Sequence, residues 1–270
     1  CVRLWRSAAP SIRNVSSARS PSVVILASCR LIWCCASTRA IEYSRPERSL
    51  ADTLSSAAND AAVRVVVIQG HELIFSAGND IKDFLSVPPD NSDAPVFRFL
   101  RALSGFAKPL VAAVCGPAVG IGTTLLLHCD LVYAGDNAAF SMPFVNLGLC
   151  PEAASSLLVP QLMGHQRAAE ALLLGEPFTA ETALEMGLIN RIVPPAEANA
   201  LAQMQAHKLA AKPMSSLLET KRLMKLGNAA LIAGRIAEES SSFGRMLREP
   251  AAREAFTAFV EKRRPDFTTL

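Results

Sequence analysis

Three short apolar runs, separated by stretches with helical spacing, constrain the fold of this chain most strongly. The runs are "RVVVIQG" (64–70), "KPLVAAVCG" (108–116) and "CDLVYAG" (129–135). Short runs that are rich in β-branched residues and bounded by glycine are typical of strands buried on both faces of a parallel sheet. Helical stretches alternate with the runs, at 49–63, 94–106 and 120–128. This alternation predicts an α/β fold.

From residue 151 onward the pattern is almost wholly helical. Apolar spacing predicts helices over 151–163, 166–174, 179–186, 196–211, 215–228 and 229–261. Strands followed by helices predict a βα core over 44–195 and a helical C-terminal region over 196–270. The segment before them, 1–43, is set apart as atypical.

That N-terminal segment differs from the rest in composition. Residues 1–41 contain six arginines, eight serines and no acidic residue. Such a composition resembles a mitochondrial transit peptide, and an aberrant, non-native terminus explains it equally well. The run "VVILASCRLIWCCA" (23–36) is interrupted by Arg30 and is too short to span a bilayer. We expect no chemistry from this segment.

Composition excludes several classes of function. A net charge of +3, without a basic stripe, argues against a nucleic-acid partner. The four histidines are scattered, and no GxxxxGK[ST], CxxC or HExxH motif occurs, so we expect no metal and no separate cofactor. Seven cysteines without regular spacing indicate free thiols in a reducing compartment rather than a disulfide framework.

Two glycine turns follow neighbouring predicted strands. They are "FSAGND" (75–80) and "CGPAVGIG" (115–122). Each is explained equally well as an ordinary turn. Together they can aim two backbone N–H groups at one oxygen, which is the geometry of an oxyanion hole.

The segments "FSAGNDIKDF", "AAVCGPAVGIGTTLLLHCDLVYAGDNAAFSMPFVNLGLCPE", "ALEMGLINRIV" and "FVEKRRPDF" resemble the enoyl-CoA hydratase/isomerase (crotonase) superfamily over roughly 49–270. The resemblance implies a crotonase (ClpP/crotonase-like) fold of repeated ββα units with a helical trimerisation region, an acyl-CoA substrate, and a homotrimer or dimer of trimers. It places the two oxyanion-hole amides at Asn79 and Ile121. It assigns substrate and CoA contacts to Ser76, Ala77, Gly78, Asp80, Ile81, Lys82, Gly120 and Phe144.

Glu152 is the candidate catalytic residue. It follows Pro151 at the expected start of a helix, where a first-turn carboxylate complementing the helix dipole is the simpler explanation. Hydratases of the family use two glutamates, at positions that hold Thr124 and Phe144 in this chain. In Δ3,Δ2-enoyl-CoA isomerases one glutamate suffices, in a "PE"-containing segment that Glu152 matches. The resemblance therefore implies an isomerase of β-oxidation. The alternatives are an enoyl-CoA hydratase or another crotonase chemistry, and a catalytically silent acyl-CoA-binding protein.

Other polar residues are expected to be structural. Asp130 lies at a helix-to-strand junction, His128 in an apolar helix, and Cys150 beside the candidate base as a small wall residue. The basic tail of Lys262, Arg263 and Arg264 is expected to be solvated rather than to bind a CoA phosphate.

One departure from the family pattern concerns the N-terminal side. "SRPERSLADTL" (44–54) lacks the usual linker after Arg45-Pro46, and the strands that normally precede it are not recognisable in 1–41. The ending "FTTL" is not a peroxisomal address, so bacterial cytoplasm or mitochondrial matrix is the expected compartment.

Overall fold

The predicted parallel sheet is present at the centre of the molecule. The computed structural model describes residues 22–27, 50–79 and 94–268. The main sheet contains β1 (Ser22–Ala27), β2 (Val63–Gln69), β3 (Leu110–Val114), β5 (Leu131–Gly135) and β8 (Arg191–Val193), in the order β1-β2-β3-β5-β8. All four pairings are parallel. The three apolar runs are thus strands, within two residues of the predicted limits.

The edge strand β1 lies in the N-terminal segment, where no strand was recognisable from the sequence. It overlaps the start of the run "VVILASCRLIWCCA", and its backbone pairs with β2 from Ser22↔Val63 to Ala27↔Gln69. Backbone pairing needs no particular side chain, so an unusual composition does not prevent it. Val23 is half-buried and packs on the apolar layer beneath α8 (Pro195–Ala210).

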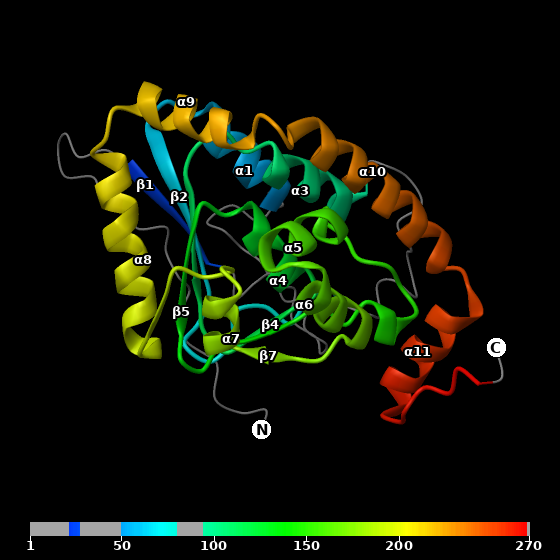
Figure 1. Cartoon of the computed structure of the whole chain (residues 1–270). Helices are drawn as coiled ribbons and strands as arrows, with labels where there is room; N and C mark the ends of the chain where they lie inside the picture. The colour runs from blue at the N-terminus through cyan, green and yellow to red at the C-terminus, as the bar shows by residue number, and fades with distance from the viewer. Residues whose placement is uncertain (1–21, 28–49, 80–93, 269–270) are drawn as a thin grey trace.

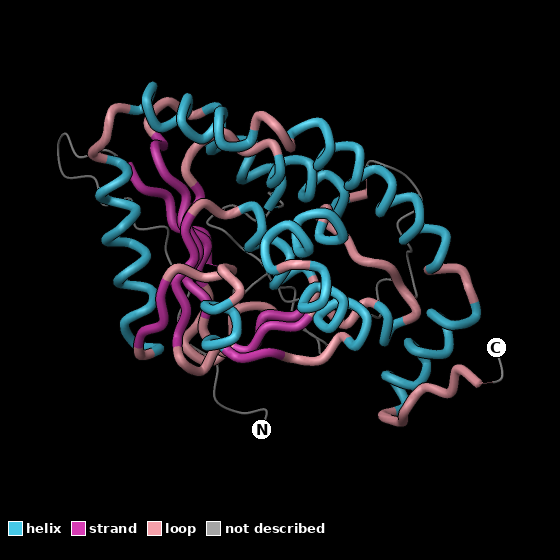
Figure 2. The backbone as a smooth tube through the Cα atoms, in the orientation of Figure 1, coloured by secondary structure: helices cyan, strands magenta, loops and turns pink. Residues whose placement is uncertain are grey.

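A second, smaller sheet is built from short strands that the sequence did not reveal. It contains β4 (Pro117–Val119), β6 (Ala139–Ser141) and β7 (Phe178–Thr179), with β4 parallel to β6 and β6 antiparallel to β7. Figure 2 shows this sheet at one end of the main sheet. Gly116 connects β3 to β4, so the chain passes directly from one sheet into the other.

Helices cover both faces of the main sheet (Figure 1). On one face α8 buries Leu201 and several alanines against Val65, Val67 and Val111. On the other face α1 and α3 pack with Val66, Ile68 and Ala112 in the larger core. The alternating residues of each strand thus bury against opposite layers, which explains the unbroken apolar runs.

Several helical boundaries differ from the expected ones. The helices are α1 (Leu50–Asn59), α3 (Pro95–Ser104), α4 (Ile121–Thr124), η2 (Leu125–His128), η3 (Val145–Leu147), α5 (Ser155–Met163), α6 (His165–Ala169), η4 (Glu170–Leu174), α7 (Ala180–Glu185), α8, α9 (Met214–Lys225), α10 (Ala229–Met246) and α11 (Pro250–Glu261). The expected helix at 229–261 is two helices, because Pro250 starts a new one. The expected helix at 151–163 begins at Ser155 instead.

A mostly buried ion pair fixes α9 to the main sheet. Lys221 Nζ lies 2.6 Å from Asp130 Oδ2 and donates to the Lys108 carbonyl at 2.8 Å. Asp130 Oδ2 also accepts from the Leu110 N–H at 2.7 Å, at the start of β3. The structural role predicted for Asp130 is confirmed.

We expect Lys221→Met to lower the free energy of unfolding by about 3 kcal/mol, because it leaves the Asp130 carboxylate without its cation. The matched control is Arg222→Met, which removes an exposed pair with Glu219 on the same helix and costs less than about 1 kcal/mol. Chemical denaturation measures both. Equal losses in the two variants would contradict the role of the buried pair.

Candidate active site

The two glycine turns lie against each other. The Ser76 N–H donates to the Pro117 carbonyl at 3.0 Å, and the Val119 N–H donates to the Ser76 carbonyl at 2.9 Å. Gly78 has φ +87°, and a Cβ atom there would lie 3.0 Å from the Val119 oxygen. The backbone of residues 75–78 therefore runs along β4, and only glycine fits at position 78 without displacing it.

The predicted oxyanion-hole amides lie on these adjoining turns. Ile121 is the first residue of α4 and follows Gly120, whose φ is +57°. In the part of the chain that the structure describes, neither the Ile121 N–H nor the Asn79 N–H donates to another group. Both amides are thus available to a ligand oxygen, and their joint action on a carbonyl stays a prediction.

The remaining predicted substrate contacts divide into two groups. Ser76 and Gly78 are buried and Ala77 is exposed, all on the first turn. Gly120 is half-buried on the second turn. Asp80, Ile81 and Lys82 lie outside the described residues.

Glu152 lies in a tight turn, not in a helix. Ala153 and Ala154 have φ of +61° and +56°, the left-handed conformation that alanine adopts only at a cost of order 1 kcal/mol. Two such residues in succession stop a right-handed helix, so α5 begins only at Ser155. The expectation that Glu152 occupies the first turn of a helix is therefore wrong, and the helix-dipole explanation does not apply.

The carboxyl group of Glu152 is buried, and one of its oxygens has no hydrogen-bond partner among the described residues. The residue is 5% exposed, and no described group bonds to its Oε1 atom. Burial and, to a smaller extent, the negative charge of Glu239 together raise the pKa of Glu152 to about 8. A carboxyl group with this pKa takes up and releases a proton near neutral pH, as a catalytic base must.

His128 fixes the turn to the α4–η2 segment. Its Nε2 atom lies 2.8 Å from the Ala153 carbonyl oxygen. Burial lowers the pKa of His128 to about 4, so the ring is neutral, and Nε2 must carry the proton because a carbonyl only accepts. The prediction that His128 is a satisfied core histidine is confirmed.

Glu239, on α10, is a residue that the sequence analysis did not single out. Its Oε2 atom accepts from the Ala154 N–H at 2.6 Å, and its Oε1 atom accepts from the Ser156 N–H at 3.0 Å. One sequence signal could have identified it: Glu239 is a charged residue on the apolar stripe of α10, with Ile236 and Phe243.

The two positions at which hydratases carry glutamates are both buried. Thr124 lies on α4 with an Oγ1 atom that has no partner among the described residues. Phe144 packs in a second apolar cluster with Leu149 and Phe256. Neither side chain is a carboxylate, so Glu152 is the only acid among these three positions.

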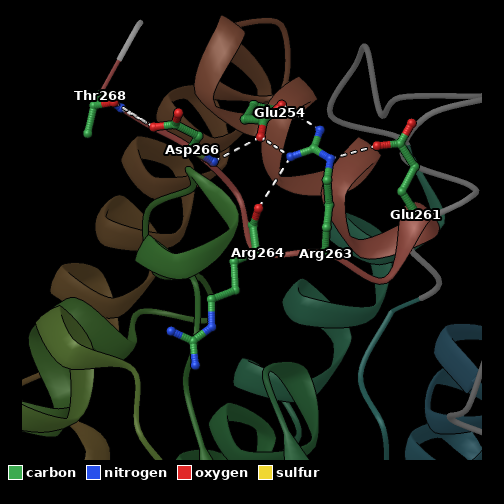
Figure 3. Close-up of polar contacts among 6 residues, drawn as sticks. All are labelled: Glu254, Glu261, Arg263, Arg264, Asp266 and Thr268. Carbon is green, nitrogen blue, oxygen red and sulfur yellow. Dashed lines mark hydrogen bonds and ion pairs between the residues drawn. The ribbon is translucent and has the colours of Figure 1, made fainter.

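Cys150 and the basic tail have structural contacts. Burial raises the pKa of the Cys150 thiol to about 11, so it stays protonated and unreactive at neutral pH. Arg263 pairs with Glu254 and Glu261 and donates to the Arg264 carbonyl at 3.3 Å, whereas the Arg264 side chain points away from this network (Figure 3). All three residues of the tail are exposed, as expected, and the surface ion pairs of Arg263 hold the chain end against α11.

A separate cavity of about 1020 Å³ lies between α3 and α10. Its lining is apolar and basic, and includes Phe97, Ile236, Arg101 and Lys225, but none of Asn79, Ile121 and Glu152. Within the described residues, no group of three His, Cys, Asp or Glu side chains could hold a metal, and no helix is long and apolar enough to cross a membrane.

We expect Gly78→Ala to lower kcat/KM at least tenfold, because the new Cβ would push the first turn away from the second. Gly164→Ala is the matched control. Gly164 also has a positive φ, +80°, but nothing lies within 4 Å of its Cβ position. Steady-state kinetics and melting curves compare the two. Equal activity in both variants would contradict the assignment of the turns to the site.

We expect Glu152→Gln to stabilise the protein selectively at high pH. The folded pKa lies above the unfolded value, so the folded state binds the extra proton and the parent loses stability as pH rises from about 5 to about 9. The variant lacks this loss, and its melting temperature should exceed the parent's at about pH 9 but not at about pH 5. Parallel melting temperatures across that range would contradict the raised pKa.

Comparison with known proteins gives the family. The enoyl-CoA hydratase/isomerase family model matches residues 46–269. A solved structure, OdaA from Pseudomonas aeruginosa, is 46% identical, covers 90% of this chain and 96% of its own, and has a TM-score of 0.80. The 2,3-dehydroadipyl-CoA hydratase of Escherichia coli is 32% identical over 81% of this chain and 86% of its own. Enoyl-CoA delta isomerase 2 of Rattus norvegicus is 37% identical over 68% of this chain and 51% of its own. The chain has the crotonase fold and belongs to the enoyl-CoA hydratase/isomerase family.

Proposed function

We propose that this protein is a Δ3,Δ2-enoyl-CoA isomerase, which shifts the double bond of a 3-enoyl-CoA to give 2-trans-enoyl-CoA during β-oxidation. The observation that carries the proposal is the Glu152 carboxyl group, which is buried, has an unpartnered Oε1 atom and has a pKa of about 8. The similarity to the rat protein named enoyl-CoA delta isomerase 2 supports the same choice.

The reaction needs one base and one anion-binding site. Ionised Glu152 removes a proton from C2 of the substrate. The electrons of that C–H bond form a C1=C2 double bond, and the carbonyl electrons move onto the thioester oxygen, which gives a dienolate conjugated with C3=C4. The Asn79 and Ile121 N–H groups stabilise the resulting dienolate, where one such donor is worth roughly 3 kcal/mol. The same Glu152 then returns the proton to C4. The product has the same atoms as the substrate, and the base is regenerated.

Hydration of a double bond requires acid–base groups that these residues do not supply. Adding water to a double bond requires activation of the water and delivery of a proton to carbon, which two glutamates share in hydratases of the family. Thr124 and Phe144 stand at those positions. A threonine hydroxyl and a phenyl ring do not take protons from water at neutral pH.

An enoyl-CoA hydratase is the second candidate. It is favoured by the similarity to the Escherichia coli protein named 2,3-dehydroadipyl-CoA hydratase, which covers most of both chains. Glu152 would then have to serve as both acid and base.

The assembly expected from the family, a homotrimer or a dimer of trimers, also stays a prediction that analytical ultracentrifugation tests.

We expect Glu152→Gln to lower kcat for 3-enoyl-CoA roughly 10³-fold, because glutamine keeps the shape of the side chain but removes the base. In the parent, kcat/KM should rise with pH through an inflection near the Glu152 pKa of about 8, as the base ionises. Formation of the 2-trans product, coupled to its downstream oxidation, measures both.

The control is Glu170→Gln, which removes an exposed carboxylate and should retain full activity. Binding of an acyl-CoA analogue is measured in each variant. Parent turnover of 2-trans-enoyl-CoA to the 3-hydroxy product at the isomerase rate would contradict the proposal. Binding without turnover of either substrate would instead identify a silent acyl-CoA-binding protein.

A further inference from the structure

We infer that Glu239 is a positioning residue for the reaction: it anchors the turn that carries Glu152 and, as a buried like charge, keeps the shared proton on Glu152. This inference rests on the proposed function, because it concerns the same proton transfer. The two groups come from distant parts of the chain, since Glu239 belongs to α10 and Glu152 to the turn before α5.

The contacts of Glu239 hold the start of α5. Its Oε2 atom accepts from the Ala154 N–H at 2.6 Å, and its Oε1 atom accepts from the Ser156 N–H at 3.0 Å and the Ser156 hydroxyl at 2.6 Å. The residue at the N-cap position, Ala154, has no side chain that could do this. Glu239 therefore caps α5 from another helix and fixes the turn two residues after Glu152.

The placement of Glu239 leaves it little freedom. It is 6% exposed and lies on the buried stripe of α10 with Ile232, Ile236 and Phe243. A carboxylate at such a position costs free energy unless donors satisfy it. The donors of the α5 turn do so, and the apolar neighbours on α10 keep the carboxylate aimed at them.

The negative charge of the pair belongs on Glu239. Three hydrogen bonds favour its ionised form, and Arg235 adds a cation nearby, so these groups oppose the burial that raises the pKa of Glu239. Oε1 of Glu152 has no such donor among the described residues. Two buried carboxyl groups in mutual repulsion share one proton, and it resides on the group with fewer donors.

Among the described residues, no other group supplies a like charge that acts on Glu152. Glu239 is the charged residue whose field acts on Glu152. The remaining titratable or charged groups around the turn are His128 on η2, Lys221 and Lys225 on α9, Cys150 in the preceding loop, and Arg235, Glu238 and Arg245 on α10. His128 and Cys150 are neutral at pH 7 because burial moves each pKa away from neutrality.

The first test is the pH profile of kcat/KM for Glu239→Gln. Loss of the like charge should move the acid limb of the profile to lower pH by roughly one unit. Loss of an acceptor should lower kcat about tenfold or more with little change in KM, because the turn is no longer fixed. The matched control, Glu238→Gln, removes the neighbouring carboxylate, which is 75% exposed and should change neither quantity. An unmoved limb would overturn the inference.

A second, milder variant tests the positioning role in case Glu239→Gln fails to fold. Ser156→Ala removes the hydroxyl contact to Glu239 but leaves its charge, so it should lower kcat several-fold and leave the acid limb in place. Unchanged kcat in Ser156→Ala would count against the positioning role.

A double-mutant cycle separates this inference from the proposed function, because it needs no activity. Melting temperatures of the parent, Glu152→Gln, Glu239→Gln and the double variant are compared at about pH 5 and about pH 9. Repulsion between the two carboxylates predicts non-additive changes at the higher pH only. Additive changes at both would overturn the inference, whereas a parent that fails to isomerise 3-enoyl-CoA would overturn only the function.

Discussion

The close approach at Gly116 is the constraint on which the arrangement of the site depends. The backbone there has φ +64°, and a Cβ atom would lie 2.1 Å from the Leu73 oxygen, so only glycine permits this corner. At this residue the chain leaves β3 in the main sheet and enters β4 in the second. Because β4 also pairs with the backbone at Ser76, the corner sets one glycine turn beside the other. The two available amides are a consequence of how the sheets join.

The sequence predicts the central strands well because their environment is uniform. Each is buried on both faces, so runs such as "LVAAV" (110–114) are apolar throughout. The strands of the second sheet are two or three residues long, too short for a periodic pattern. β1 was not recognised in the sequence, because its surroundings are rich in arginine and serine. A strand at the sheet edge nevertheless depends chiefly on backbone pairing. Local composition was a poor guide where the backbone alone makes the contact.

The candidate site was predictable only as far as short motifs extend. Both glycine turns and Glu152 lie in continuous segments whose residue order is informative. The environment of Glu152 is not local, because Glu239 lies 87 positions further along the chain and His128 approaches from η2. "AEESSSF" (237–243) reads as a solvated helix face, although one of its two glutamates falls on the buried stripe. The left-handed conformation of Ala153 and Ala154, which delays the start of α5 to Ser155, cannot be predicted from the residue type.

The C-terminal helices have a part in the candidate site. Glu239 of α10 holds the start of α5, and Gly148, four residues before Glu152, packs directly on the α11 backbone at Ala251 and Ala252. The loop from Gly148 to Ala154 is thus clamped between two helices that follow it by about a hundred positions. Insertions, deletions or repacking in α10 and α11 would therefore displace the loop that carries Glu152, although that loop lies about a hundred positions earlier in the chain. In the evolution of such a chain, the packing of its last two helices and the loop that carries Glu152 are not free to vary independently.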